Sequence, residues 1–453
     1  MEFINYILAL GPSVMLPLVI FIFAIVLGQK PGRAFRSGVM IGIGFIGIGL
    51  VIGLMLNNLG PAAKLMAERF GVQLTVVDVG WPGSSPMTWA SQVGGLSIPI
   101  AIAVNIVMLA LGLTKVVNVD IWNIWHMAFT GALLHIATGS LTIGLVGVAI
   151  HAAIVFKLGD WFAPVIEKYF DLKGIAIPHG SSAYCGPIAV PIEWLLARIP
   201  GVRDISFTSE TIEEKFGVIG EPMIIGLILG AVIGALAGYE AKLVLQLGMQ
   251  MGAVMVLMPK VVKCIMEGLL PVADSARVLL EKKFAGKKFY VGLDPALLLG
   301  DTQVVAISLL FVPLTLIIAA IVPGNKVLPF GDLATIGFFV AMAVGIHHGN
   351  LFRTLVSGCV IMAGTLWIST QTIGFHTILA QQAGTKLAEG VTQVASLDQG
   401  GSPITYIMLQ LFHMDNLIGL LVIGGIYLIS IIATIQYSRG ESKVDEKEKI
   451  VAQ

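Results

Sequence analysis

Long apolar runs of bilayer length constrain this chain more than any other feature. A hydrocarbon core about 30 Å thick requires about 20 apolar residues per crossing helix. Lipid offers the backbone no hydrogen-bond partners, so each run must satisfy its own groups, as a helix does. The runs are 7–28, 37–58, 95–114, 117–137, 139–157, 221–240, 243–259, 304–322, 333–349, 351–373 and 416–437. The sequence therefore predicts an all-α integral membrane protein with about 11 transmembrane helices.

The composition supports this class and excludes others. Charged residues make up only 12% of the chain, against about 25% in soluble proteins, which excludes a soluble enzyme. The 27 basic and 27 acidic residues cancel, so no overall charge points to nucleic acid. The 3 cysteines lack metal-ligand spacing, and no phosphate-binding or metal-binding motif is present. We expect no metal site, no cofactor and no nucleic-acid partner.

Lysine and arginine in short connections mark the cytoplasmic side of a membrane protein. The chain has three such groups of basic residues: one after the first span, one after the seventh span and one in the charged tail at 439–453. The first two groups are Lys30, Arg33 and Arg36, and then Lys260, Lys263, Arg277, Lys282, Lys283, Lys287 and Lys288. The sequence therefore predicts a periplasmic N-terminus and a cytoplasmic C-terminus, which requires an odd number of spans.

Four apolar segments are interrupted by Gly, Pro and Ser and fail as ordinary spans. They are 74–94, 174–198, 289–303 and 397–413. Irregular backbone is tolerated at membrane depth only where protein or a wet cavity surrounds it. We expect re-entrant broken helices there; plain extramembrane loops are the alternative. Mixed apolar and charged segments that predict interfacial helices are 60–73, 261–288 and 376–396.

The two halves of the chain repeat the same order of features. Asp120 and His135 match Asp332 and His347 at an offset of 212 residues, and Asp78 matches Asp294 at 216. Each half has an odd number of crossings, so the second half is expected to be inverted, as in carriers with a site near the membrane midplane. The predicted divisions are a first repeat at 1–198, a cytoplasmic connection at 199–220, a second repeat at 221–413, a final span at 414–437 and a tail at 438–453.

Ionisable residues at membrane depth are functional candidates because they are costly to insert. Asp78 and Asp294 lie in the first broken segment of each half. Their carboxylates could accept hydrogen bonds from a polyol or sugar, or bind a proton or cation. They could equally cap the helix that follows.

Polar and aromatic residues near the breaks complete the candidate site. His126 lies one turn from Asn123, on a polar face that cannot point at lipid. His179 lies in the Pro-His-Gly-Ser-Ser break, and Trp81 could cover the C–H side of a polyol. A histidine that is merely hydrogen-bonded in the bundle, and a tryptophan at the membrane interface, remain the alternatives.

Six motifs carry a family resemblance. They are VDVGWPGSSPMTWAS, VDIWNIWHMAFTGALLH, GIAIPHGSSAY, VGLDPALLLG, VLPFGDLATIGFFVAMAV and LDQGGSPIT. From about residue 5 to about residue 437, the chain resembles the galactitol-specific membrane components (IIC) of the bacterial phosphoenolpyruvate-dependent sugar phosphotransferase system, in the ascorbate and galactitol superfamily.

The resemblance implies a group translocator in the bacterial inner membrane. It would take up galactitol, present it to a cytosolic IIB subunit that carries a phosphocysteine and is supplied by IIA, and release galactitol phosphate inside. It also implies a homodimer with a substrate-holding core domain, a scaffold domain and an elevator movement. The chain has no phosphoryl-carrying residue of its own in this scheme.

The resemblance also assigns residue roles. Substrate contacts carried over from relatives fall on the region of Gly80 and Trp81, on His126, on His179 with Gly180, and on Asp294 and Phe330. Asp294 or His179 could serve as the base for the attacked hydroxyl. The alternative function is an ion-coupled secondary transporter of a polyol or sugar in which Asp78 and Asp294 bind the coupling ion.

Overall fold

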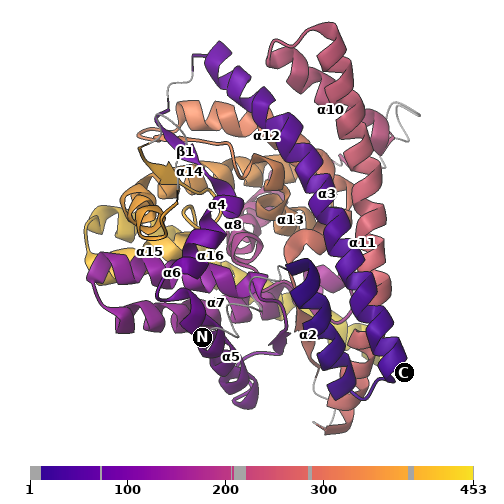
Figure 1. Cartoon of the computed structure of the whole chain (residues 1–453). Coiled ribbons are helices and arrows are strands. Elements are labelled where there is room, and N and C mark those ends of the chain that lie inside the picture. The colour runs from indigo at the N-terminus through magenta and orange to yellow at the C-terminus, as the bar shows by residue number, and fades with distance from the viewer. Residues whose placement is uncertain are drawn as a thin grey trace.

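The computed structural model describes residues 12–71, 74–205, 207–208, 221–283, 288–385 and 392–451. Helices make up most of this part of the chain (Figure 1). The α-helices are α2 (Pro12–Val26), α3 (Pro31–Arg69), α4 (Gly80–Ala90), α5 (Gly94–Ala110), α6 (Trp122–Thr138), α7 (Leu141–Lys168), α8 (Gly180–Leu196), α10 (Pro222–Leu236), α11 (Ala241–Lys283), α12 (Thr302–Ile321), α13 (Gly337–Ile346), α14 (Leu351–Gln382), α15 (Pro403–His413) and α16 (Leu417–Val451). The 3-10 helices of the described ranges are η2 (Pro295–Gly300) and η3 (Leu333–Thr335).

Within these described ranges, 6 helices are long and apolar enough to cross a membrane. A seventh crossing arises if α4 and α5, which bend by 93° at Ser91–Val93, count as one. These helices identify a membrane protein. The predicted span at 333–349 is wrong as one continuous helix, because α13 has only 10 residues and follows the separate turn η3. Ten residues rise only about 15 Å, half of the hydrocarbon core.

Long helices run into all three predicted interfacial segments. They cover most of 60–73 and 261–288, and the first part of 376–396 as far as Gln382. α3 extends over 39 residues, α11 over 43 and α14 over 32. The change from apolar to charged residues therefore occurs along one helix and does not start a new one. A 39-residue helix is about 58 Å long, which exceeds the bilayer thickness, so it must tilt or protrude. Parts of several predicted segments lie outside the described residues, namely 7–11, 72–73, 209–220, 284–287 with Lys287, and 386–391.

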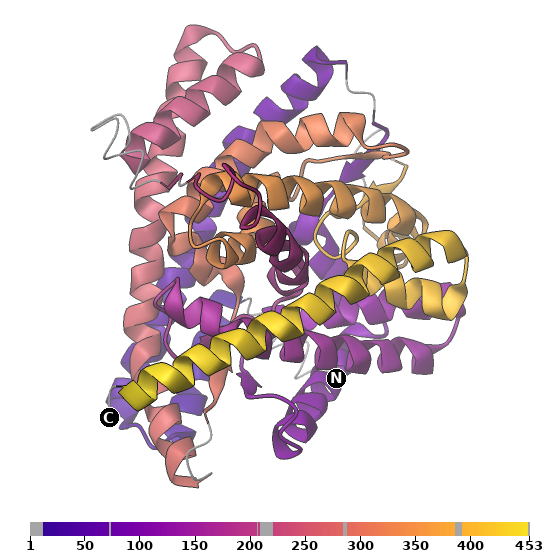
Figure 2. The ribbon, with the colours of Figure 1, turned by 180° about the vertical axis from the view of Figure 1, so that it is seen from behind.

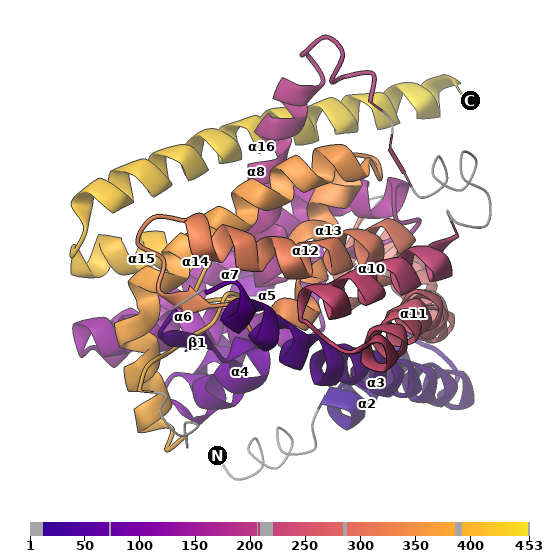
Figure 3. The ribbon, with the colours of Figure 1, turned by 90° about the horizontal axis from the view of Figure 1, so that it is seen from above.

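Helices α2, α3, α10 and α11 form a layer of their own along one side of the molecule (Figures 1 and 3). The two halves contribute equally to it, since α2 and α3 come from the first half and α10 and α11 from the second. The long helices approach closely where Gly44 of α3 faces Ile265 of α11, whose Cγ1 atom lies 2.2 Å from the position that a Cβ on Gly44 would occupy. Small residues of this kind allow close helix packing in lipid.

The remaining helices form a second group, and α16 crosses it on the face seen from behind (Figure 2). Helix α8 lies within this group and packs against α13 and α16. Glu193 near the end of α8 accepts a hydrogen bond from His347 and forms an ion pair with Arg353, so it fixes α8 to α13 and α14. The broken segment that carries His179 is thereby held by helices of the other half.

Among the described residues, six short strands interrupt the helices, and the all-α prediction missed them. The strands are β1 (Val76–Asp78), β2 (Val116–Asn118), β3 (Ile175–Ala176), β4 (Tyr290–Gly292), β5 (Val327–Leu328) and β6 (Val394–Ala395). They pair in parallel into two three-stranded sheets, in the orders β5-β1-β6 (sheet A) and β2-β4-β3 (sheet B). Strand pairing satisfies the backbone where the chain is not helical, as membrane depth requires.

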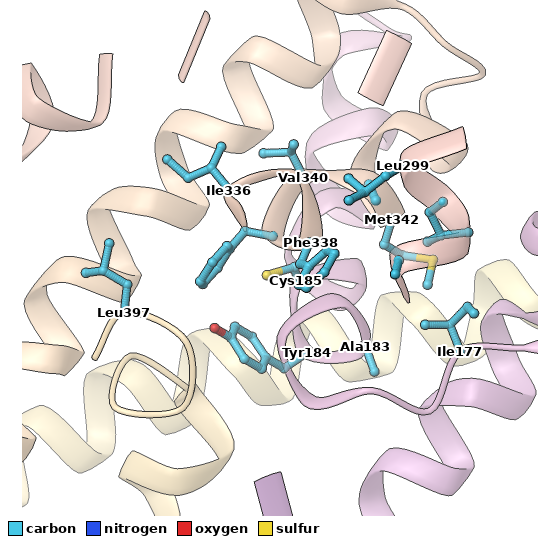
Figure 4. Packing of buried hydrophobic residues seen from close by; sticks show 14 of the residues in the cluster. Ile177, Ala183, Tyr184, Cys185, Leu299, Ile336, Phe338, Val340, Met342 and Leu397 are labelled. Carbon is cyan, nitrogen blue, oxygen red and sulfur yellow. The ribbon is translucent and has the colours of Figure 1, made fainter. Parts of the chain in front are cut away.

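The two sheets have the same plan with the halves exchanged. In sheet A the central strand β1 belongs to the first half and both flanking strands to the second. In sheet B the central strand β4 belongs to the second half and both flanking strands to the first. Beneath the sheets, Ile177, Tyr184, Phe338 and Leu397 converge from both halves into one apolar core (Figure 4). Neither sheet is complete without both halves.

Candidate functional site

The carboxyl ends of the strands gather most of the buried acidic residues. Because strands in a parallel sheet end at the same edge, residues that follow them lie close together. Asp78 ends β1 and Asp398 follows β6 at the edge of sheet A. Asp120, His179 and Asp294 follow the three strands of sheet B. Each edge thus places ionisable side chains beside the start of a helix.

His179 and Asp294 form the first of two histidine–aspartate pairs. His179 Nε2 lies 3.5 Å from Asp294 Oδ2, and His179 Nδ1 lies 2.9 Å from Ser181 Oγ. Asp294 is the N-cap of η2, where its Oδ1 accepts the Ala296 N–H at 2.7 Å. Both side chains are at least nine-tenths buried. The pair therefore joins the ends of β3 and β4, and one oxygen of Asp294 already serves the helix start.

His126 and Asp398 form the second pair, and it connects the two sheets. His126 belongs to α6, which follows sheet B, and its Nε2 lies 3.1 Å from Oδ2 of Asp398, which follows sheet A. The rings of His126 and His179 meet edge to face, with their centroids 4.0 Å apart. The two pairs are therefore one continuous buried cluster of residues from both halves.

Gly180 allows this cluster to be compact. A Cβ at this position would lie 2.5 Å from Gln399 Nε2 and 2.8 Å from His126 Cγ. Any side chain would push these groups apart. Gly180 begins α8, whose first N–H groups have no acceptor within the helix and carry partial positive charge. An anionic or electron-rich group bound here would meet these N–H groups.

Several buried polar side-chain atoms, on three of the predicted site residues and on Gln399, lack a hydrogen-bond partner within the described part of the chain. They are Trp81 Nε1, Asn123 Oδ1, His126 Nδ1 and Gln399 Oε1. A buried polar group without a partner costs about 1–3 kcal/mol. Such atoms are expected where a ligand with several hydrogen-bonding groups completes the network. The indole N–H of Trp81 is a hydrogen-bond donor. The amide oxygens of Asn123 and Gln399 are acceptors, and His126 Nδ1 is an acceptor when it carries no proton.

Comparisons with known proteins identify the family of the chain. A family model described as the PTS system sugar-specific permease component (EIIC-GAT) matches residues 6–390. The chain belongs to this family. It is 61% identical over 450 residues to the PTS system galactitol-specific EIIC component of Escherichia coli strain K12, with 99% of each chain covered. It is 38% identical over 431 residues to a putative permease IIC component of the same strain, with 95% of this chain and 97% of that one covered.

Four residues expected in the site of this permease lie together in the structure. His126, His179, Gly180 and Asp294 are all in the buried cluster. Asp398 and Gln399 belong to it as well, although sequence reasoning missed both. Both residues belong to the LDQGGSPIT motif, and attention to the charged and amide side chains of that motif would have found them.

Asp78 occupies a different environment from Asp294. Its Oδ1 accepts the N–H groups of Gly80 and Leu397 at 2.9 and 3.2 Å. Its Oδ2 accepts those of Phe330 and Asp332 at 3.1 and 2.9 Å. Both oxygens are fully used by the backbone. Only Gly80 belongs to the helix that follows, so the carboxylate joins the start of α4 to the loops at 330–332 and 397 and does more than cap that helix.

Two further residues that the resemblance assigned to the substrate lie outside the cluster. Gly80 has a φ of +62°, and its backbone packs directly on that of Gly331, so a side chain would strain both segments. The ring of Phe330 lies over Gly60 of α3 and is 38% exposed. The structure therefore places Gly80 in the support of sheet A and Phe330 between the core and the long-helix layer.

Trp81 and Asn123 lie at the start of helices beside the cluster. The ring of Trp81 packs edge to face on that of Trp122, with their centroids 5.5 Å apart. Asn123 donates through Nδ2 to Asn118 Oδ1 at 2.7 Å, while its own Oδ1 remains without a partner. Across the described ranges, no group of three His, Cys, Asp or Glu side chains is placed to hold a metal ion.

Proposed function

We propose that this chain binds galactitol, carries it across the bacterial inner membrane and presents it for phosphorylation by a phosphocysteine-bearing IIB subunit, which IIA supplies with phosphate. The observation that carries the proposal is the 61% identity, over 99% of both chains, with a galactitol-specific EIIC component. Because the match covers 99% of the chain, the compared region extends over the segments that form the cluster.

The chemistry of the cluster suits a polyol. A hexitol offers six hydroxyl groups, each of which donates one hydrogen bond and accepts others. Hydroxyl groups would donate hydrogen bonds to three acceptors, Asn123 Oδ1, Gln399 Oε1 and the Asp294 carboxylate. Trp81 Nε1 would donate a hydrogen bond to a hydroxyl oxygen. The Trp81 and Trp122 rings supply an apolar surface for the carbon chain. On this proposal Asn123, Trp81, His126, His179 and Asp294 contact the substrate.

The phosphoryl group would come from a separate protein. Cys185 is fully buried beside Tyr184 and Phe338 in the apolar core (Figure 4). Cys264 and Cys359 lie on the helices α11 and α14. A IIB subunit that carries its own phosphocysteine supplies the group that this chain lacks.

The architecture supports an inverted repeat and a two-part carrier. The exchange of halves between sheets A and B, and the equal shares of the long-helix layer, are what a pseudo-twofold axis in the membrane plane produces. The layer of α2, α3, α10 and α11 would be the scaffold through which two copies dimerise. The remaining helices would be the core that moves as an elevator, with the N-terminus periplasmic and the C-terminus cytoplasmic.

Uptake into membrane vesicles tests the proposal. Vesicles that contain the full chain should accumulate galactitol only as a phosphate ester, and only with IIA, IIB and phosphoenolpyruvate present. Accumulation of free galactitol driven by a proton or sodium gradient, without these proteins, would overturn the proposal in favour of an ion-coupled transporter. Vesicles without the chain are the control.

A further inference from the structure

Asp398 is held in place on several sides, and its carboxylate faces His126. Its backbone N–H donates to Asp332 Oδ2 at 2.9 Å, and its carbonyl accepts the Tyr184 hydroxyl at 3.0 Å. Its Oδ2 lies 3.1 Å from His126 Nε2. An aspartate fixed in this way determines how the imidazole is oriented and which of its nitrogens carries the proton.

The hydrogen bond has a consequence for the other nitrogen of His126. An ionised carboxylate only accepts hydrogen bonds, so the neutral imidazole must carry its proton on Nε2. Nδ1 then has a free lone pair, and it is one of the buried atoms that have no partner among the described residues. His179 differs, because its Nδ1 faces Ser181 and its Nε2 faces Asp294. Of the two histidines, His126 alone presents an unengaged base.

We propose that His126 is the general base of the phosphoryl transfer and that Asp398 is the residue that positions it. The inference rests on the proposed function, which supplies the phosphocysteine of IIB. A galactitol hydroxyl oxygen attacks the phosphorus, the new O–P bond forms, and the S–P bond breaks with its electron pair leaving on the cysteine sulfur. The hydroxyl proton moves to His126 Nδ1, and the Asp398 carboxylate stabilises the imidazolium.

The position of His126 in the cluster suits this role. Gly180 brings the start of α8 against the His126 ring, so the free N–H groups of that helix lie near the reacting hydroxyl. Asn123 Oδ1, Gln399 Oε1 and the Asp294 carboxylate remain available to accept hydrogen bonds from other hydroxyls of the same substrate. The base and the groups that orient the substrate are then different residues of one cluster.

The substitution Asp398→Asn separates positioning from binding. The asparagine amide can donate to Nε2, which moves the imidazole proton to Nδ1 and removes the base, while the shape of the site is kept. We expect the galactitol Kd of the purified full chain to change less than about threefold, and transfer from phosphorylated IIB to slow at least about 100-fold. Transfer within threefold of the unsubstituted chain would overturn the proposal.

A spectroscopic measurement reports the proton directly. In the 15N spectrum of histidine-labelled protein, His126 Nδ1 should be unprotonated and should become protonated in Asp398→Asn. The variant His126→Gln identifies the signal by its loss; its amide can still donate to Asp398, and its transfer rate should fall equally. A protonated Nδ1 in the unsubstituted chain would overturn the assignment.

A matched control and a separate reference keep the outcomes distinct. His151 is another fully buried histidine, bonded to Thr130 through Nδ1, and His151→Gln should transfer within about threefold of the unsubstituted chain. An equal loss in His151→Gln would show a general effect of burial and sink the inference. If the unsubstituted chain forms no phosphate ester, the proposed function itself fails, whatever the variants do.

Discussion

Asp78 and Asp294 lie at matching positions in the two halves, but their carboxylates have different hydrogen-bond partners. Asp78 ends the central strand of sheet A, and Asp294 follows the central strand of sheet B. Four backbone N–H groups occupy the Asp78 carboxylate, whereas Asp294 accepts one such group and turns its other oxygen to His179. One carboxylate holds loops together, and the other retains capacity for a ligand.

This difference shows that burial alone does not identify a functional carboxylate in a membrane carrier. Both residues are buried, and both are costly at membrane depth. The number of acceptor positions already filled by the backbone separates them. Counting the hydrogen-bond partners of the ring nitrogens likewise distinguishes the two histidines. His126 has one nitrogen without a partner, whereas both nitrogens of His179 have one.

The largest effect is expected from Asp78→Asn. The amide would turn its NH2 group toward two backbone N–H donors, and each buried donor left without an acceptor costs about 1–3 kcal/mol. We expect little folded protein after extraction, measured by size-exclusion chromatography and thermal unfolding. Asp415→Asn, at an exposed aspartate near the start of α16, is the control. Normal recovery of Asp78→Asn would remove the contrast between the two aspartates.

Asp294→Asn should instead spare the fold and stop the activity. Its amide oxygen can still accept the Ala296 N–H, so we expect thermal unfolding within about 4 °C of the unsubstituted chain. Loss of the charge that faces His179 should lower galactitol phosphate formation at least about 100-fold. The assay is transfer from phosphorylated IIB in vesicles. Normal transfer would take Asp294 out of the site.

Gly180→Ala tests whether the compactness of the cluster matters. The new Cβ would clash with Gln399 and His126, and overpacking of this kind costs about 1–3 kcal/mol. We expect the galactitol Kd to rise about tenfold, measured by calorimetry. Gly374→Ala in α14, where a Cβ meets nothing within 4 Å, should bind normally. Equal binding by both variants would contradict the close approach.

Trp81→Phe should have the smallest effect. It keeps an aromatic ring against Trp122 and removes the indole N–H, which has no partner in the structure. If galactitol accepts from this N–H, its loss should raise KM about threefold to tenfold at unchanged kcat, because a neutral hydrogen bond contributes about 1 kcal/mol. An unchanged KM would place Trp81 in the support of the site alone.

The sequence predicted a mainly helical membrane protein, several of its long apolar helices and four residues of the cluster, for physical reasons that particular residues illustrate. The described residues support six or seven of the 11 spans expected. The apolar runs at 139–157 and 304–322 became α7 and α12 because a bilayer-length apolar segment has few other stable forms. His126, His179 and Asp294 were found because charge at membrane depth is rare. The strands were missed because two or three residues, such as Ile175–Ala176, are too short to show alternation.

The sequence could not predict that Asp398 contacts His126, or that backbone N–H groups fill the acceptor positions of the Asp78 carboxylate. Asp398 meets His126 across 272 positions of the chain, and no local pattern reports such a contact. Asp78 receives N–H groups from loops near residues 330 and 397, which sequence reasoning could not bring to it. Both facts depend on how the two sheets assemble.

The exchange of strands also sets when the protein can finish folding. Strand β1 emerges from the ribosome early, but its partners β5 and β6 follow only at Val327–Leu328 and Val394–Ala395. Strand β1 therefore lacks both flanking strands while most of the chain is synthesised. Completion of sheet A is then a late event that waits for β6 and the Asp398 that follows it, so a chain truncated before residue 395 lacks part of the buried cluster.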